Sequence, residues 1–308
     1  MAQYYTLGAS LPTLKIDDHK GTEYTASTFV SEVLRQTTRE DARQINLLLL
    51  PHDNAVLLAA LGGKEAYRVD EPLAIGKDKI LALVKLLREK ELDTPNPFEG
   101  QEGIRKSDFP AYMIDFAHEY LMDQATDHPS DFFYEDLLQY MYYRHVQKVG
   151  NDFLRVWTTL DRNITLILAA ITAKRFDLDA KKMIIGESEL VKLLRSGSWG
   201  DVSYLEEGDV VKSISQISEE QDLSLKERKI DLFKWTFLDS LTFADSFSIN
   251  AMMAYYLKLR ILHRWSQLDK EQGEKTFRSI IEELNKEGKN DLEAFKEMTK
   301  SKKSRFRK

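Results

Sequence analysis

An uncharged run in the middle of the chain, Asn163 to Ala173, limits the fold more than any other feature. It follows Asp161-Arg162 and stops at Lys174-Arg175. A helix needs about 20 consecutive apolar residues to cross a bilayer, so this run is too short to span one. A helix without a polar face must be surrounded by other helices. We therefore expect a buried helix here, with Asp161 as its N-cap residue.

A second, largely apolar stretch, Asn46 to Gly63, contains the polar segment Pro51-His52-Asp53-Asn54. Proline breaks helix interiors, so this segment predicts an interruption. The two halves that remain are each too short to cross a membrane. We expect the second half to be a buried helix that ends at Gly62-Gly63.

The two stretches share a pattern in which a polar start precedes a short uncharged helix. Asp53 and Asn54 mark the first start, and Asp161 and Asn163 mark the second. A weaker copy begins at Asn250. Repetition of this kind predicts a core assembled from similar helical units, with chance similarity of short windows as the alternative.

Helical periodicity extends over much of the remaining chain. One face of an amphipathic helix between residues 78 and 92 is predicted by Ile80, Leu83, Val84 and Leu87. Ser188 and Gly197 are placed to cap and to end a shorter helix. A third helix, over residues 131–148, is expected to share one face among Phe133, Leu137, Tyr140 and Met141.

Turn-forming residues predict breaks at residues 92–103, 125–131 and 195–214. The last of these is the longest region expected to be irregular. Segments that suggest strands are too short to build a sheet around, so the sequence predicts an all-α protein.

Composition excludes several kinds of chemistry. The sequence has no cysteine, which excludes disulfides, thiolate metal sites and cysteine nucleophiles. The net charge is −6, yet residues 300–308 carry six basic side chains and no acid, so the rest of the chain is at about −12. That balance disfavours nucleic acid as a partner of the folded body. The basic tail is either solvated or a contact for phosphate or anionic lipid.

The strongest candidate for an enzyme site is the segment "DFAHEYLMD". Asp115, His118, Glu119 and Asp123 are close enough along one helix to bind a divalent metal, although a solvated helix face is the more common explanation of such a cluster. The segment "LGGKEAY" lacks the spacing of a phosphate-binding loop, and "SGSWG" lacks that of a nucleophile elbow. We expect no cofactor.

Aromatic residues beside charge suggest where a partner could bind. Trp265 has His263 and Arg264 as its neighbours, which is typical either of an interface anchor or of the edge of a core. We retain Trp265 and Arg264 as interface candidates.

The segment from Thr159 to Leu194 resembles the middle repeat of a V-type and A-type ATPase family, known as the C subunit in prokaryotes and the d subunit in eukaryotes. That repeat contains an Asp, an Asn-Leu pair opening a buried helix, a basic residue, and an Ile-Pro-Gly-like turn into the next helix. Asp161, Asn163-Ile164, Lys174-Arg175 and Ile184-Ile185-Gly186 occur here in that order.

Both ends of the chain add to the resemblance. Residues 250–281 are similar to the last repeat of the family, and residues 1–14 are similar to the openings of a bacterial branch whose genes lie beside V-type ATPase genes. The chain departs from the family at Ala169, where an Arg is usual, and between Ala251 and Leu268, where an acid is usual. It therefore resembles a divergent member.

The resemblance implies a funnel-shaped, all-α domain of about three helical units, near residues 1–103, 104–197 and 215–300, followed by the basic tail. It further implies a non-catalytic subunit that links the central stalk to the proteolipid ring of a V/A-type ATPase, in proton or sodium transport. Such a subunit would be cytoplasmic, on the cytoplasmic face of the inner membrane. The N-terminus also lacks the pattern of a secretory signal.

Two other functions stay open at this point. A free-standing helical adaptor or scaffold would share the architecture without the ATPase partners. A metal-dependent helical enzyme would use the four side chains from Asp115 to Asp123.

Overall fold

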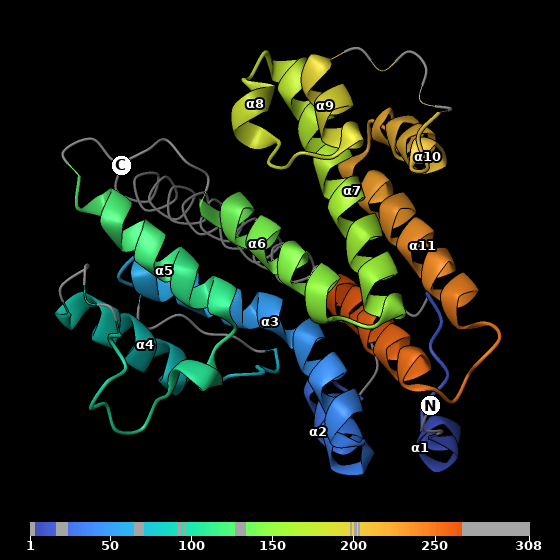
Figure 1. Ribbon diagram of the computed structural model, residues 1–308. Coiled ribbons are helices and arrows are strands. Elements are labelled where there is room, and N and C mark those ends of the chain that lie inside the picture. Colours follow the sequence, from blue (N-terminus) through green and yellow to red (C-terminus); the bar gives the residue numbers. More distant parts are fainter. Residues whose placement is uncertain are drawn as a thin grey trace, which may run out of the picture. The chain divides into compact units, whose positions relative to one another are not determined.

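A computed structural model describes residues 4–16, 24–64, 71–90, 94, 96–126, 134–197, 199, 202 and 204–266 (Figure 1). Every regular element among these residues is helical, which confirms the all-α prediction. The chain divides into two compact units. The first comprises Met1–Thr13 and Ala26–Lys258, and the second comprises Leu14–Thr25 and Leu259–Lys308.

The helices follow one another along the chain as α1 (Tyr5–Ser10), α2 (Ala26–Gln36), α3 (Arg39–Leu61), α4 (Lys77–Glu89), the 3₁₀ helix η1 (Lys106–Asp108), α5 (Ala111–Gln124), α6 (Tyr134–Val149), α7 (Asp152–Phe176), α8 (Ala180–Met183), α9 (Glu189–Ser196), α10 (Gly208–Ser218) and α11 (Leu223–Thr242). Residues 249–266 form a further helix.

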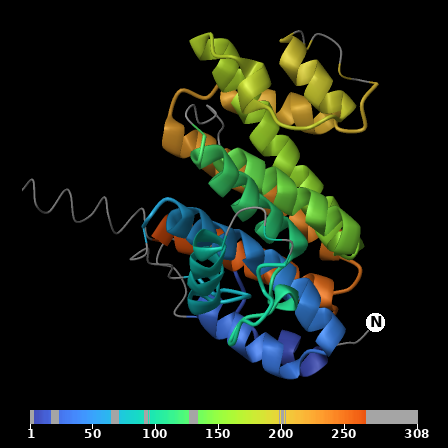
Figure 2. The same ribbon diagram turned by 60° about the vertical axis from the view of Figure 1, so that its left-hand side comes forward.

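Two long helices act as centres of packing in the first unit. Helix α3 packs against α4, α5 and α6, whereas α7 packs against α6, α8, α9, α10 and α11. Helix α6 therefore contacts both centres (Figure 1). In both views the orange-red start of helix 249–266 passes beside α3, where His52 Nε2 lies 3.2 Å from the Tyr256 hydroxyl (Figure 2). The first unit is thus built around α3 and α7.

The start of α7 corrects the predicted N-cap. Asn151 caps the helix, because its side-chain oxygen accepts the backbone N–H of Leu154 at 2.9 Å. Asp161 lies well inside the helix, and its carboxylate faces α6 and α11 instead of a helix end. Asn163 is buried, and so are half of the residues that follow it in the run, whereas Thr165 and Thr172 are exposed. The run is the second half of a longer core helix.

Helix α3 corrects the predicted interruption, because it continues through Pro51. A proline inside a helix leaves the carbonyl four residues earlier without its N–H donor. That carbonyl belongs to Leu47, and the Tyr142 hydroxyl of α6 donates a hydrogen bond to it at 3.1 Å. A tertiary contact thus replaces the missing helical bond. The predicted end at Gly62 is confirmed.

Helix α3 is the one helix in the described ranges whose length and apolar composition would allow it to cross a membrane. Of its most apolar window, 67% is buried inside the protein. Buried packing against α4, α5 and α6 is typical of a core helix.

The shorter elements test the periodicity argument. Helices α4 and α9 form as predicted, with Ser188 and Gly197 capping α9 and the four predicted residues of α4 buried.

The predicted face of α6 is wrong: its buried residues are Leu138, Tyr142, Tyr143 and Val146. Leu137, Tyr140 and Met141 are half-buried, and Phe133 lies outside the described residues. The break predicted over residues 195–214 is also too long, because α9 reaches Ser196 and α10 begins at Gly208.

Candidate functional site

A fully buried carboxylate fixes the turn that leads into α4. Asp53, on α3, has an exposed fraction of 0%. Its two oxygens accept the backbone N–H groups of Ala74, Ile75 and Gly76 at 2.8, 3.1 and 3.2 Å. Burial raises the pKa of the Asp53 carboxyl, and the three N–H donors act in the opposite direction. The predicted motif residue Asp53 is therefore a clamp between a long helix and the next short one.

A cation holds the corresponding turn after α7. The Arg162 guanidinium donates to the carbonyl of Ile185 at 3.3 Å. The next residue, Gly186, has a φ of 136°, and a Cβ at this position would lie 2.2 Å from Arg162 Nη2. Glycine suits both the backbone conformation and the close approach. Arg162 and Gly186 thus lock the entry to α9 against α7.

The two turns share a plan. In each, a long helix is followed by an Ile-Gly turn and a short amphipathic helix with an Arg in its last turn. Arg88 donates to the carbonyl of Leu61 at 2.9 Å, and Arg195 donates to that of Ile184 at 2.7 Å. The two turns are built alike, as repeated helical segments would be, but the clamping residue is an acid, Asp53, at the first turn and a base, Arg162, at the second.

The other motif residues occupy different environments. Asn54 accepts a hydrogen bond from the buried Tyr112 hydroxyl at 2.9 Å, and burial raises the pKa of that hydroxyl well above its usual value. Asp161 accepts from Tyr143 at 3.0 Å and pairs with Lys234 at 2.6 Å. Asp53 and Asp161 are therefore not equivalent positions.

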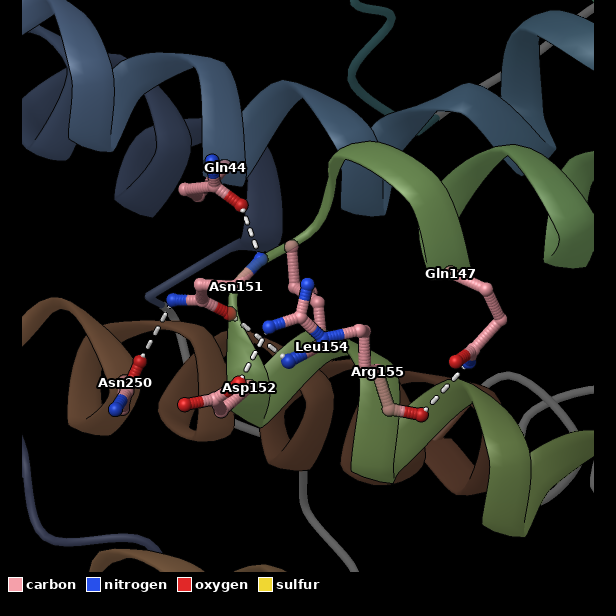
Figure 3. Close-up of polar contacts among 7 residues, drawn as sticks. All are labelled: Gln44, Gln147, Asn151, Asp152, Leu154, Arg155 and Asn250. Atoms are coloured by element: carbon pink, nitrogen blue, oxygen red, sulfur yellow. Dashed lines mark hydrogen bonds and ion pairs between the residues drawn. The ribbon is translucent and has the colours of Figure 1, made fainter.

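Asn151 joins three helices of the first unit (Figure 3). Its backbone N–H donates to Gln44 of α3 at 2.9 Å, and its side-chain amide donates to Asn250 at 3.0 Å. The same side chain caps α7 through Leu154. Because its partners are 107 and 99 residues away, sequence reasoning did not find this junction.

The proposed metal ligands do not form a site. Asp115, His118 and Glu119 lie exposed on α5, and Asp123 accepts a hydrogen bond from the Tyr134 hydroxyl. No group of three or more side chains able to hold a metal ion occurs in the described parts of the chain, which include all four residues. The arrangement is that of a solvated helix face.

The interface candidates near the C-terminus lie in the second unit. Trp265 has an exposed fraction of 9%, whereas Arg264 is exposed, with its guanidinium 5.5 Å from the centre of the Trp265 ring. Arg264 thus remains accessible to a partner, and Trp265 is close to fully buried. The basic tail at residues 300–308 lies outside the described residues.

An exposed apolar surface occurs at the end of α7, and sequence reasoning missed it. We call residues 174–182 the α7 tip. Phe176 and Leu178 are 65% and 50% exposed, on either side of Asp177, whose φ of 52° turns the chain. Four exposed basic residues flank them in the sequence, Lys174, Arg175, Lys181 and Lys182, and the tip also contains the exposed acids Asp177 and Asp179. In "KRFDLDAKK" two basic pairs flank a short segment with exposed apolar residues, and this pattern was the signal that could have identified the tip.

The comparisons assign the chain to a family. A family model matches residues 1–288, and the chain belongs to that family, which is described as "Protein of unknown function (DUF2764)". No curated protein and no solved structure matches the chain.

Proposed function

We propose that this chain is a non-catalytic coupling subunit of a V/A-type rotary ATPase. In that role it links the central stalk to the proteolipid ring during proton or sodium transport. The observation that carries the proposal is the ordered set of residues, from Asp161 to Gly186, that resembles the middle repeat of the ATPase family. In the structure these residues lie in α7 and the turn clamped to it by Arg162.

A subunit that transmits torque must resist deformation between its two attachment points. Close-packed interiors transmit strain, and fully paired polar groups fix the relative positions of helices. The clamps at Asp53, Arg162 and Asn151 tie the centres of packing to neighbouring elements in the first unit. This construction supports a mechanical role.

The α7 tip is the surface that we assign to the ring side. Exposed apolar side chains such as Phe176 and Leu178 are typical of binding sites when they lie together. The four basic residues of the tip outnumber its two acids, Asp177 and Asp179, and this positive balance suits the negative surface of a cytoplasmic leaflet. We expect the tip to contact the cytoplasmic loops of the ring near that surface.

Co-purification tests the proposal. The tagged chain is recovered from native membranes in mild detergent, washed at low and at high salt, and its partners are identified by mass spectrometry. Central-stalk and proteolipid subunits in a fixed ratio would support the proposal. A lone soluble chain would contradict it and would favour the free-standing adaptor or scaffold.

A matched pair of variants tests the tip. Phe176→Ser combined with Leu178→Ser removes the apolar residues of the tip and should reduce recovery of the ring subunits at least tenfold. Phe243→Ser serves as the control, because Phe243 is 89% exposed at the end of α11. Equal recovery with both variants would remove the tip from the interface.

A further inference from the structure

Two guanidinium groups converge on one tyrosine ring between α6 and α7. Arg162 lies 5.1 Å and Arg144 lies 5.8 Å from the centre of the Tyr140 ring. Lys148 follows Arg144 by one helical turn on α6. The three cations line a recess of about 220 Å³, together with Gln147, Thr158 and Thr159. The recess therefore collects positive charge in a small volume.

Carboxylates near the recess do not balance that charge. None of those in the described ranges lines it. Asp161, next to Arg162 in sequence, accepts from Tyr143 and pairs with Lys234. Asp136 lines a neighbouring hollow of about 40 Å³ that Arg162 also borders, but the two form no ion pair in the described part of the chain. Arg162 instead contacts the Ile185 carbonyl and the Tyr140 ring.

Three like charges around one recess repel one another, and water screens the half-buried Arg162 less than the exposed Arg144 and Lys148. Burial lowers the pKa of the Arg162 guanidinium, so its charged form already bears a desolvation cost. Tyr143, which also borders the recess, is no source of negative charge, because burial raises its pKa well above the usual value. A bound anion would supply the missing charge.

Hydrogen-bond donors in the recess match an oxygen-rich anion. The Thr159 hydroxyl accepts from Gln147 at 3.1 Å and, among the described residues, has no acceptor for its own proton. Guanidinium groups present paired N–H donors that fit phosphate oxygens. The volume is below the range of about 300–1,000 Å³ typical of pockets for drug-sized ligands, which favours a small ion or a single headgroup.

We propose that the recess between α6 and α7 binds a phosphate-type oxyanion, with Arg162 as its central ligand and Arg144, Lys148 and Thr159 at its rim. The proposal does not depend on the rotary-ATPase assignment, because it rests on the geometry of the recess alone.

Titration of the full chain with inorganic phosphate at low ionic strength, followed by calorimetry, tests the site. Chloride at the same ionic strength is the reference. We expect saturable binding with one phosphate per chain. The double variant Arg144→Ala with Lys148→Ala, whose two positions are exposed, should weaken binding at least tenfold without disturbing the fold. Arg162→Lys keeps the positive charge but loses the paired N–H donors of the guanidinium, so it should also weaken phosphate binding.

Arg155→Ala is the matched control, since Arg155 also lies on α7 but pairs with Asp152 at 2.5 Å. Its phosphate affinity should equal that of the wild type. Absence of saturable binding, or equal loss in the control and in the recess variants, would overturn the proposal. Circular dichroism of each variant confirms that a loss of binding does not reflect unfolding.

Phosphatidylcholine vesicles with and without phosphatidic acid distinguish the two sources of phosphate. If the recess holds a lipid headgroup, inorganic phosphate should displace the chain from the vesicles that contain phosphatidic acid, and Arg162→Lys should bind them weakly. If it holds free phosphate, vesicle binding should be the same for wild type and Arg162→Lys. Either result supports the site, provided that calorimetry detects phosphate binding.

Discussion

At the scale of single residues, buried polar groups hold one helix to the next. The Asp53 carboxylate accepts hydrogen bonds from three backbone N–H groups at the start of α4. The Tyr142 hydroxyl donates a hydrogen bond to the Leu47 carbonyl, which Pro51 leaves without a donor in α3. Buried polar groups that lose their partners are costly, so each contact fixes a specific arrangement of helices. These residues are expected to matter for stability more than for chemistry.

Asp53→Ala should lower the free energy of unfolding by about 3 kcal/mol, because it leaves three N–H groups without their acceptor. Asp53→Asn should lower the free energy of unfolding by less, since its one remaining oxygen can still accept hydrogen bonds from the backbone N–H groups. Urea unfolding monitored by circular dichroism measures both changes. Glu119→Ala, at an exposed position on α5, is the control and should change stability by less than about 0.5 kcal/mol. Equal values for Asp53→Ala and the control would contradict the clamp.

The environment of His145 on α6 predicts that the stability of the protein depends on pH. Burial, with a smaller contribution from Lys148, lowers the pKa of His145 in the folded state. The unfolded chain then binds a proton more readily, so stability should fall as the pH drops from about 6.5 toward the lowered folded value. His145→Gln removes the titrating group. Between pH 8 and pH 5 the melting temperature should fall less in this variant than in the wild type. An equal fall in both proteins would show that His145 is not the source of the pH dependence.

At the scale of elements, the sequence predicts helices whose signals are local. Helices α4 and α9 form as expected because their periodicity and caps lie within a few residues. The prediction fails where a residue far away in the sequence determines where a helix begins or whether it continues. Tyr142 allows α3 to pass Pro51, and Asn151 starts α7 before Asp161 because it also binds Gln44 and Asn250.

In the candidate site, too, local features can be predicted from the sequence and distant partners cannot. Asp53, Asn54 and Asp161 are recognisable in the sequence, because acids and amides within apolar runs are unusual. Their partners are not, since the turn at residues 74–76 and the side chains of Tyr112 and Lys234 lie 21 or more residues away. The α6 face is mistaken for a related reason: its aromatic residues fit several faces, and packing against α3 and α7 selects one.

Gly186 and Gly63 allow backbone strain to be separated from close approach. Both have a positive φ, but a Cβ at Gly63 meets nothing within 4 Å, whereas one at Gly186 displaces the Arg162 guanidinium. Gly63→Ala should lower the free energy of unfolding by about 1 kcal/mol. Gly186→Ala should cost at least about 2 kcal/mol, because Arg162 also loses its hydrogen bond to Ile185. Denaturant unfolding compares them, and a smaller loss for Gly186→Ala would contradict the lock.

The Asn151 junction can be measured by a double-mutant cycle with Asn250. Asn151→Ala should cost about 1–2 kcal/mol, because α7 loses its N-cap and its contact with Asn250. Asn151→Ser should retain the cap and lose only the contact. We expect a coupling energy of about 1 kcal/mol between Asn151 and Asn250, and additive losses would show that the contact does not contribute.

At the scale of the whole molecule, the all-α fold agrees with a part that carries force. In the first unit, two long helices are joined through α6, and buried hydrogen bonds secure their neighbours. The end of α7 presents apolar and basic side chains outward. This combination of a fixed interior and an exposed tip underlies the proposed coupling role.

The most direct test of that role is ATP-driven ion uptake by native membrane vesicles prepared without this chain. We predict that ATP hydrolysis continues while uptake of protons or sodium is lost. Adding back the wild-type chain or Phe243→Ser should restore uptake, and adding back the Phe176→Ser and Leu178→Ser double variant should not. Unchanged uptake in vesicles that lack the chain would contradict the proposed function.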